Sequence, residues 1–139
     1  MAGPIVAYHG HQPRGGGAGI ITAMDADAQE CGLVAHLPKH SPAGMAWGYP
    51  GSGASDCARS LLVAALGRAA RCPACDDGTC GWCDLGYLHL PYHRYKDEVV
   101  AKFPDDWRMH RACILSWLLR ADPGVLEWMI ALEGGRHLL

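Results

Sequence analysis

Four of the seven cysteines lie within twelve residues, and no other residues in this chain are better suited to bind a metal. They form two C-x₂-C pairs, Cys72 with Cys75 and Cys80 with Cys83. Four thiolates at this spacing fit the tetrahedral coordination of a structural zinc ion, which leaves no position for water. Such a saturated ion holds a fold together and carries out no reaction. The spacing therefore predicts one structural zinc bound by these four cysteines.

Several alternatives to this ligand set remain open. His89 or His93 could replace one thiolate, an iron–sulfur cluster could replace zinc, or the cysteines could be free or disulfide-bonded. Between the two pairs, Gly78 is expected to give the short loop the backbone freedom to fold back on the ion. The other three cysteines have apolar neighbours and are predicted to be small core residues: Cys31, Cys57 and Cys113.

Length and charge limit the class of protein. The chain has 139 residues, 50% of them hydrophobic, and a formal net charge of −2. This length predicts a single domain over residues 1–139. No overall positive charge would attract nucleic acid or an anionic membrane. No apolar run approaches the roughly 18–20 residues needed to span a bilayer. We expect a cytoplasmic protein without a membrane partner, because thiols stay reduced in the cytoplasm and clustered cysteines then favour metal.

The strands and helices that must position these cysteines can be predicted from hydrophobic periodicity and from turn-forming residues. Extended segments are predicted at 20–24, 32–37 and 45–49. Helices are predicted at about 54–67 with Ser52 as N-cap, at 91–103, from after Asp106 to about Arg120, and from Asp122 to Gly134. Strands first and helices later predict an α+β fold, in which a small antiparallel sheet packs with about four helices.

Several motifs outside the cysteines carry a family resemblance. They are Tyr8 with Gly10, SPAGMAWGYPGSG at 41–53, Tyr92 to Lys96, Trp107, and Trp117 with Leu118. With these motifs the chain resembles domain of unknown function 6166, a family of small bacterial and phage domains, over about residues 8–119. The resemblance implies a small α+β accessory protein from actinobacteria or their phages, and it brings no activity with it. Against the family pattern, residues 71–87 look like an inserted zinc hairpin and residues 121–139 like an added C-terminal helix.

Trp82, inside the cysteine stretch, raises the question of nucleic-acid binding. Compact zinc knuckles often bind single strands by stacking bases on such an aromatic. However, residues 68–84 contain two arginines and three aspartates, and four thiolates on a zinc ion add a further net −2. This charge repels phosphate. We therefore expect Trp82 to pack on the domain or on a protein partner.

The glycines before the first predicted helix suggest a second, weaker site. Gly51, Ser52 and Gly53 follow the spacing of a phosphate-binding Walker A loop, but Ala54 stands where that loop needs lysine. The helix N-terminus could still hold an anion on its exposed amides. The alternative is a sharp turn without a ligand.

The last predicted helix offers a third candidate surface. Trp128 and Met129 lie in it, and a helix added to a complete domain can present its apolar face to another chain. The alternative is that this helix docks on its own core.

No residue pattern names a reaction. The eight histidines combine on paper with cysteines and aspartates into many triads, so no single one indicates catalysis. We therefore expect a non-enzymatic, zinc-stapled accessory protein of phage or mobile-element type. It would bind a host or phage protein, with host machinery or host defence as the targets considered. The alternative hypothesis is a zinc-knuckle protein that binds nucleic acid.

Overall fold

The structure is a computed structural model and describes residues 3–13, 17–75 and 77–133. Within them the strands are β1 (Ala7–His11), β2 (Ile20–Met24), β3 (Glu30–Leu33) and β4 (Asp106–His110). The α-helices are α1 (Ser52–Leu66), α2 (Tyr92–Glu98), α3 (Arg111–Ala121) and α4 (Pro123–Glu133), and two 3₁₀ turns are η1 (Gly67–Ala70) and η2 (Val100–Lys102). The fold is α+β, as predicted.

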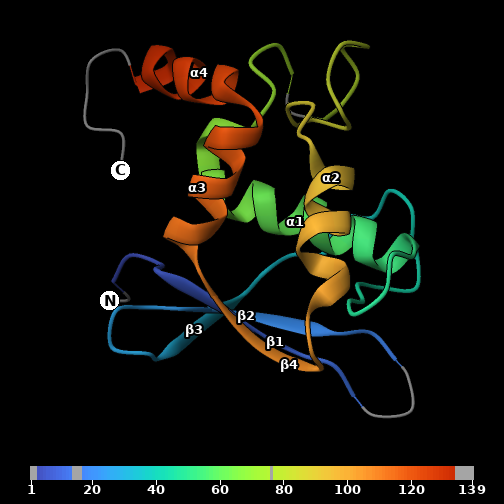
Figure 1. Cartoon of the computed structure of the whole chain (residues 1–139). Coiled ribbons are helices and arrows are strands. Elements are labelled where there is room, and N and C mark those ends of the chain that lie inside the picture. The colour runs from blue at the N-terminus through green and yellow to red at the C-terminus, as the bar shows by residue number, and fades with distance from the viewer. Residues whose placement is uncertain (1–2, 14–16, 76, 134–139) are drawn as a thin grey trace.

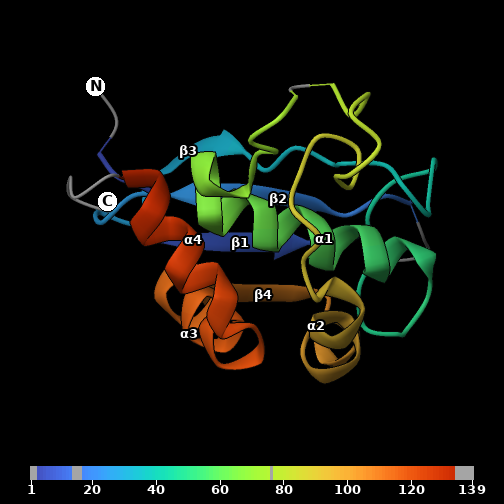
Figure 2. The ribbon, with the colours of Figure 1, turned by 90° about the horizontal axis from the view of Figure 1, so that it is seen from above.

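The strands form one antiparallel sheet in the order β3-β2-β1-β4. Helices cover one of its faces (Figure 1), with α1 across the middle and α2 and α3 toward β4 (Figure 2). Side chains alternate along β1, so Tyr8 and Gly10 face the helices while His9 faces away from them. The sheet therefore has a core side and a polar side.

Helix α1 lies at the centre of the core. Every residue from Gly53 to Leu62 is buried, which small side chains such as Ala54 and Ala58 permit because they let other elements approach closely. Trp47 is 1% exposed and meets Trp107 edge to face, with ring centroids 5.6 Å apart. One hydrophobic cluster contains residues from Tyr8 to Met129, so elements from both halves of the chain share a core.

The strand predictions were partly wrong. β1 was not predicted, because its glycine and two histidines hide the alternation. β4 was taken for the start of a helix, although exposed Asp106, Arg108 and His110 alternate with buried Trp107 and half-buried Met109. β3 starts and ends earlier than the predicted 32–37. The segment 45–49 is not a strand, and Trp47 N–H donates to the Gln12 side chain instead.

Two smaller predictions also need correction. Ser52 is the first residue of α1 and not its N-cap, because Gly51 takes that position without a side-chain hydrogen bond. Of the three cysteines expected in the core, only Cys57 is buried, while Cys31 and Cys113 are exposed. Apolar neighbours in sequence therefore did not indicate burial for those two residues.

Candidate metal centre

The two cysteine pairs meet in space, in a loop inserted between η1 and α2. The Sγ atoms of Cys72, Cys75, Cys80 and Cys83 all lie within 4.8 Å of one another. Cys72 Sγ is 3.8 Å from Cys80 Sγ, and Cys75 Sγ is 3.7 Å from Cys83 Sγ. These separations are far longer than the bond of about 2.0 Å in a disulfide. The four thiols are thus neighbours without being bonded to one another.

The separations fit a single metal ion. Ligands about 2.3 Å from a tetrahedrally coordinated zinc lie about 3.8 Å from each other, close to the two distances found. A cluster with several irons and bridging sulfides would need more room between the thiolates than one ion does. The arrangement therefore indicates a Cys₄ site for one ion, which would hold the loop in shape and leave no open coordination position.

The backbone of the loop is turned toward the sulfurs. Ala74 N–H lies 3.3 Å from Cys72 Sγ, Trp82 N–H lies 3.4 Å from Cys80 Sγ, and Gly86 N–H lies 3.2 Å from Cys83 Sγ. The hydrogen bond from Trp82 N–H, followed by that from the Cys75 thiol, lowers the pKa of Cys80 to about 6. The lowered value favours the Cys80 thiolate, the form that binds metal, whereas burial raises the pKa of Cys83 to about 12. Gly78 has a φ of +84°, in agreement with the turn predicted there.

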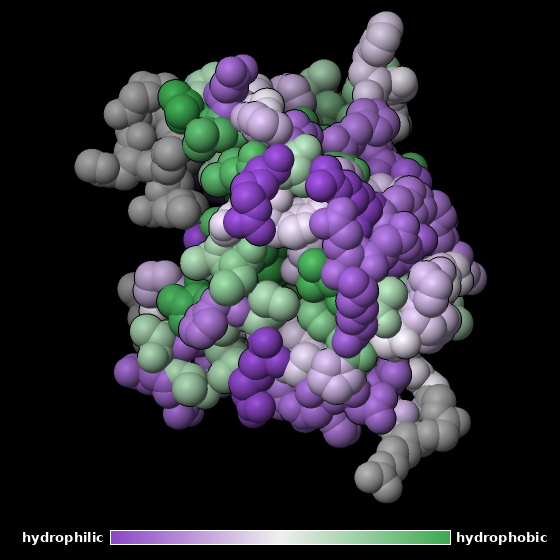
Figure 3. Space-filling model, viewed as in Figure 1, coloured by the Kyte–Doolittle hydropathy of each residue, from purple (hydrophilic) through white to green (hydrophobic). Residues whose placement is uncertain are grey.

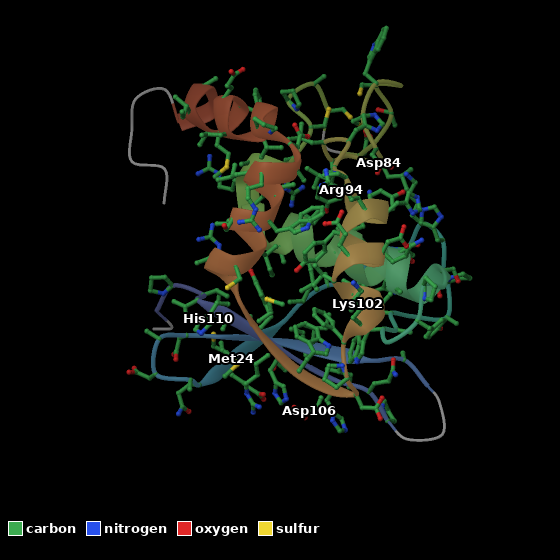
Figure 4. The ribbon with its side chains drawn as sticks, viewed as in Figure 1. Met24, Asp84, Arg94, Lys102, Asp106 and His110 are labelled. Carbon is green, nitrogen blue, oxygen red and sulfur yellow. The ribbon has the colours of Figure 1, made fainter. Side chains whose placement is uncertain are left out.

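A buried ion pair attaches the loop to the helical core. Asp84 directly follows Cys83 and is 5% exposed. Its Oδ2 accepts from Arg59 Nε at 3.2 Å, and its Oδ1 accepts from Lys39 Nζ at 2.6 Å. Burial opposes ionisation of Asp84, but the Lys39 hydrogen bond and the Arg59 charge hold its pKa below the ordinary value. Figure 4 shows Asp84 at the base of the loop, above α2.

Sequence reasoning missed this anchor. Arg59 is a buried charged residue of α1, as Asp56 is, and is 2% exposed. It also donates to the carbonyls of Asp84 and Leu37. A charged residue among the buried positions of a predicted helix was the signal that could have revealed it.

The two histidines considered as ligands lie outside the thiol group. His89 Nε2 is 2.9 Å from the carbonyl oxygen of Trp82. The His93 ring packs against Tyr92 and His40, with centroids 4.4 Å and 5.1 Å away. The ligand set in the described residues is therefore the four cysteines.

The predicted partner-binding residues differ in exposure. Trp82 is 85% exposed. Trp128 is half-buried, and its indole N–H donates to the Ala69 carbonyl at 2.8 Å. Met129 is 6% exposed and belongs to the core, so its side chain is not available to a partner. Leu126 and Ile130 are exposed apolar side chains of α4, in the region where Figure 3 shows hydrophobic atoms gathered.

The candidate anion loop at Gly51, Ser52 and Gly53 does begin α1. The Tyr49 ring packs on Gly51, at the place where a Cβ atom would lie. Gly53 is buried, and its carbonyl accepts from Ala46 N–H at 3.1 Å. These contacts fit the turn that was the alternative to an anion site.

A separate polar cluster joins three strands on the uncovered face of the sheet. His9 Nδ1 lies 2.7 Å from Glu30 Oε1, and His9 Nε2 lies 3.1 Å from Asp106 Oδ1. His11 Nδ1 is 3.5 Å from Asp106 Oδ2. Because both ring nitrogens of His9 face carboxylates, protonated His9 links β3, β1 and β4.

We expect this cluster to make stability depend on pH. The Glu30 and Asp106 hydrogen bonds raise the pKa of His9, opposed by desolvation and Arg108. Because the pKa of His9 is higher in the folded state than in the unfolded state, protonated His9 stabilises the fold. This stabilisation is complete at pH values below the unfolded-state pKa of about 6.5, and it is lost as pH rises through the folded-state pKa. The pKa values of Glu30 and Asp106 are lowered, chiefly by His9, so their contribution is lost as pH falls. The cluster should stabilise most at about pH 5–6.

Denaturant unfolding at several pH values tests this expectation. His9→Gln should flatten the fall in stability between about pH 6 and 8. His110→Gln changes a histidine on the same face that contacts no carboxylate in the described residues, and it should leave the curve unchanged. Parallel curves for the wild type and His9→Gln would contradict the expectation.

The fold and site together define a small α+β protein with a Cys₄ cluster suited to one metal ion. Residues 8–76 match the model of a Family of unknown function (DUF6166), so this part of the chain is similar to that family. The match runs from β1 to just past Cys75, which is shorter than the 8–119 expected from the motifs. Comparison with curated proteins gave no match, and neither did comparison with solved structures. In the described part of the chain, no helix has the length and apolar character that crossing a bilayer requires.

Proposed function

We propose that this chain is a non-enzymatic accessory protein of phage or mobile-element type, stapled by one zinc ion, that acts in the cytoplasm by binding another protein. The zinc assignment rests on the thiol separations and on the reducing compartment inferred for clustered cysteines. The phage or mobile-element setting, with host machinery or host defence as target, rests on the family resemblance alone.

The observation that carries the binding proposal is the exposure of Trp82. Its side chain is 85% exposed on a loop held at four thiols and anchored through Asp84. Exposed tryptophan is unfavourable in water, and tryptophan is enriched among the residues that dominate binding energy in protein interfaces. A rigid loop loses little conformational freedom on binding, which favours affinity. The loop therefore has the properties of an anchor for a partner.

A continuous surface extends from Trp82 toward α4. One hollow beside the loop is lined by Trp82, Leu88 and His89. A second, lined by the same Leu88 and His89, continues to Val125 and Trp128 of α4. The exposed side chains of Leu126 and Ile130 lie on this helix. A partner seated on Trp82 could thus also cover the apolar side of α4.

Nucleic-acid binding is the second candidate, because an exposed tryptophan is also a stacking platform for bases. The charge around the loop opposes it. Asp77 is exposed, and four thiolates on one zinc carry a net −2. The Arg71 guanidinium lies 5.9 Å from the Tyr87 ring centroid, so it packs on an aromatic of the loop. Few positive groups are thus available to follow a phosphate backbone.

Affinity capture from the native host, followed by mass spectrometry and binding measurement with the purified partner, tests the proposal. Trp82→Ala should weaken that complex by about thirtyfold, the effect of losing roughly 2 kcal/mol at an interface anchor. Tyr49→Ala removes an aromatic that is 51% exposed elsewhere and should leave affinity unchanged. If short single-stranded DNA or RNA binds at near-physiological salt with micromolar affinity, and Trp82→Ala abolishes that binding, the second candidate replaces the first.

A further inference from the structure

A cavity that is not lined by any of the four thiols lies beside α1. Its volume is about 480 Å³, within the range of pockets that hold small molecules. It lies between β3 with the segment that follows it and the C-terminal half of α1, two elements that Figure 2 shows side by side. Its walls are chiefly aliphatic and include Ile5, Leu33, Val34, Leu37, Val63 and Ala64.

The polar side chains in these walls are Tyr8, Ser60, Tyr87 and Arg111. Ser60 Oγ already accepts a hydrogen bond from a backbone N–H. Tyr8 lines the cavity and is 2% exposed. In the described part of the chain, the buried side-chain groups without a hydrogen-bond partner are the Tyr95 hydroxyl and the Trp107 indole N–H, and the Tyr8 hydroxyl is not one of them. Because Tyr8 belongs to the cavity wall, its hydroxyl can still donate a hydrogen bond to a ligand there.

Arg111 is the charged group in these walls, and part of its guanidinium is fixed. Its Nε donates to the Ala65 carbonyl at 2.8 Å, which leaves the two terminal nitrogens for other partners. No carboxylate lies within ion-pair distance of Arg111 in the described part of the chain. A held guanidinium with free terminal N–H groups is a geometry suited to bind a carboxylate.

The position of Arg111 in the fold strengthens the positive potential at this end of the cavity. Arg111 is the first residue of α3, and the first turn of α3 contains no acidic residue. Figure 4 labels His110, which immediately precedes it. Positive charge at a helix N-terminus is unfavourable for the helix itself, because the peptide dipoles already make that end positive. Arg111 and the helix end therefore both attract an anion.

The titration of Tyr8 agrees with this arrangement. Burial raises the pKa of the Tyr8 hydroxyl, and the Arg111 charge acts in the opposite direction. The phenol therefore stays protonated at neutral pH and remains a hydrogen-bond donor. Its pKa responds to the charge of Arg111, so the two side chains lie near each other.

We propose that the cavity binds a small apolar carboxylate. The hydrocarbon part of the ligand lies against the aliphatic walls, and the carboxylate oxygens accept hydrogen bonds from the Arg111 guanidinium and the Tyr8 hydroxyl. A neutral apolar molecule would accept no hydrogen bond from either of these groups, and a strongly polar one would leave the walls unfilled. The inference concerns a different site from the Trp82 surface and does not depend on it.

Calorimetric titration of the full-length, metal-loaded protein with octanoate tests the proposal, with octanol as a neutral probe of similar shape. Octanoate should bind in a saturable way and at least about tenfold more tightly than octanol, because a charge-assisted hydrogen bond contributes more than a neutral one. Saturable binding that does not distinguish octanoate from octanol would overturn the assignment, and so would absence of octanoate binding at millimolar concentration.

Matched variants place the ligand in this cavity. Arg111→Met should weaken octanoate binding about tenfold or more while leaving octanol binding nearly unchanged. Arg120→Met removes an exposed arginine from the other end of α3 and should have no effect. Because Arg111→Met also breaks the bond to Ala65, Tyr8→Phe provides a second test that keeps the buried ring, with an expected loss of about threefold to tenfold. Unchanged octanoate affinity in folded Arg111→Met or Tyr8→Phe protein would overturn the proposal.

Discussion

Removal of zinc should release the loop between Cys72 and Cys83, while Asp84 stays paired with Arg59 and the helices and sheet remain folded. Structural zinc contributes on the order of 10 kcal/mol to small modules, and this loop has few apolar contacts of its own. The buried core of α1, by contrast, includes Leu61 and Leu62 with no exposed area. Chymotrypsin, which cleaves after aromatic and leucine residues, should therefore cut the chelated protein near Trp82, which is 85% exposed, and leave the remainder intact.

Cys75→Ser should reproduce the effect of chelation, and Cys113→Ser should not, because Cys113 is exposed and lies outside the thiol cluster. Elemental analysis of freshly reduced wild-type protein should find one zinc per chain. Iron in its place, or a stoichiometry near zero, would refute the zinc assignment. Complete loss of helical structure in Cys75→Ser would show instead that the whole domain depends on the metal.

Asp84→Ala should lower the free energy of unfolding by about 3–5 kcal/mol, the usual cost of removing one partner from a buried ion pair. The cost arises because Arg59, 2% exposed, would remain charged in the core without a carboxylate. Lys39 would lose its contact at 2.6 Å as well. Denaturant unfolding measures the loss directly.

Two further variants separate the buried charge from other effects of the Asp84 change. Asp77→Ala removes an exposed aspartate of the same loop, whose side chain bonds only to Thr79 in the described residues, and should change little. Arg59→Met combined with Asp84→Leu removes both charges and should recover much of the loss. A cost for Asp84→Ala no larger than that for Asp77→Ala would mean that the ion pair does not anchor the loop.

The sequence predicted those features that have a local cause. Spacing alone placed the four thiols together, and turn residues with helical periodicity located α1 and α4. The fold class followed from the order of the elements. Trp82 was recognised as a residue of interest because of its place between two cysteines, although its exposure could not be read from the sequence.

What the sequence did not reveal depends on contacts between distant residues. β1 pairs with β2 and with β4, its neighbour some hundred positions along the chain, and no local pattern indicates such a pairing. Asp84 and Arg59 are separated by 25 residues, so neither marked the other. The cavity needs β3, α1 and Arg111 together, and Arg111 by itself resembles any surface arginine.

Arg59 has a consequence for how such a loop could be gained or lost during evolution. A buried arginine destabilises the fold unless a carboxylate pairs with it. Here Asp84, the residue after the last cysteine of the cluster, supplies that carboxylate. Deletion of the loop would therefore leave Arg59 of α1 without its carboxylate partner. A lineage that discarded the cysteines would come under pressure to replace the arginine with an apolar residue, so the two changes should be inherited together.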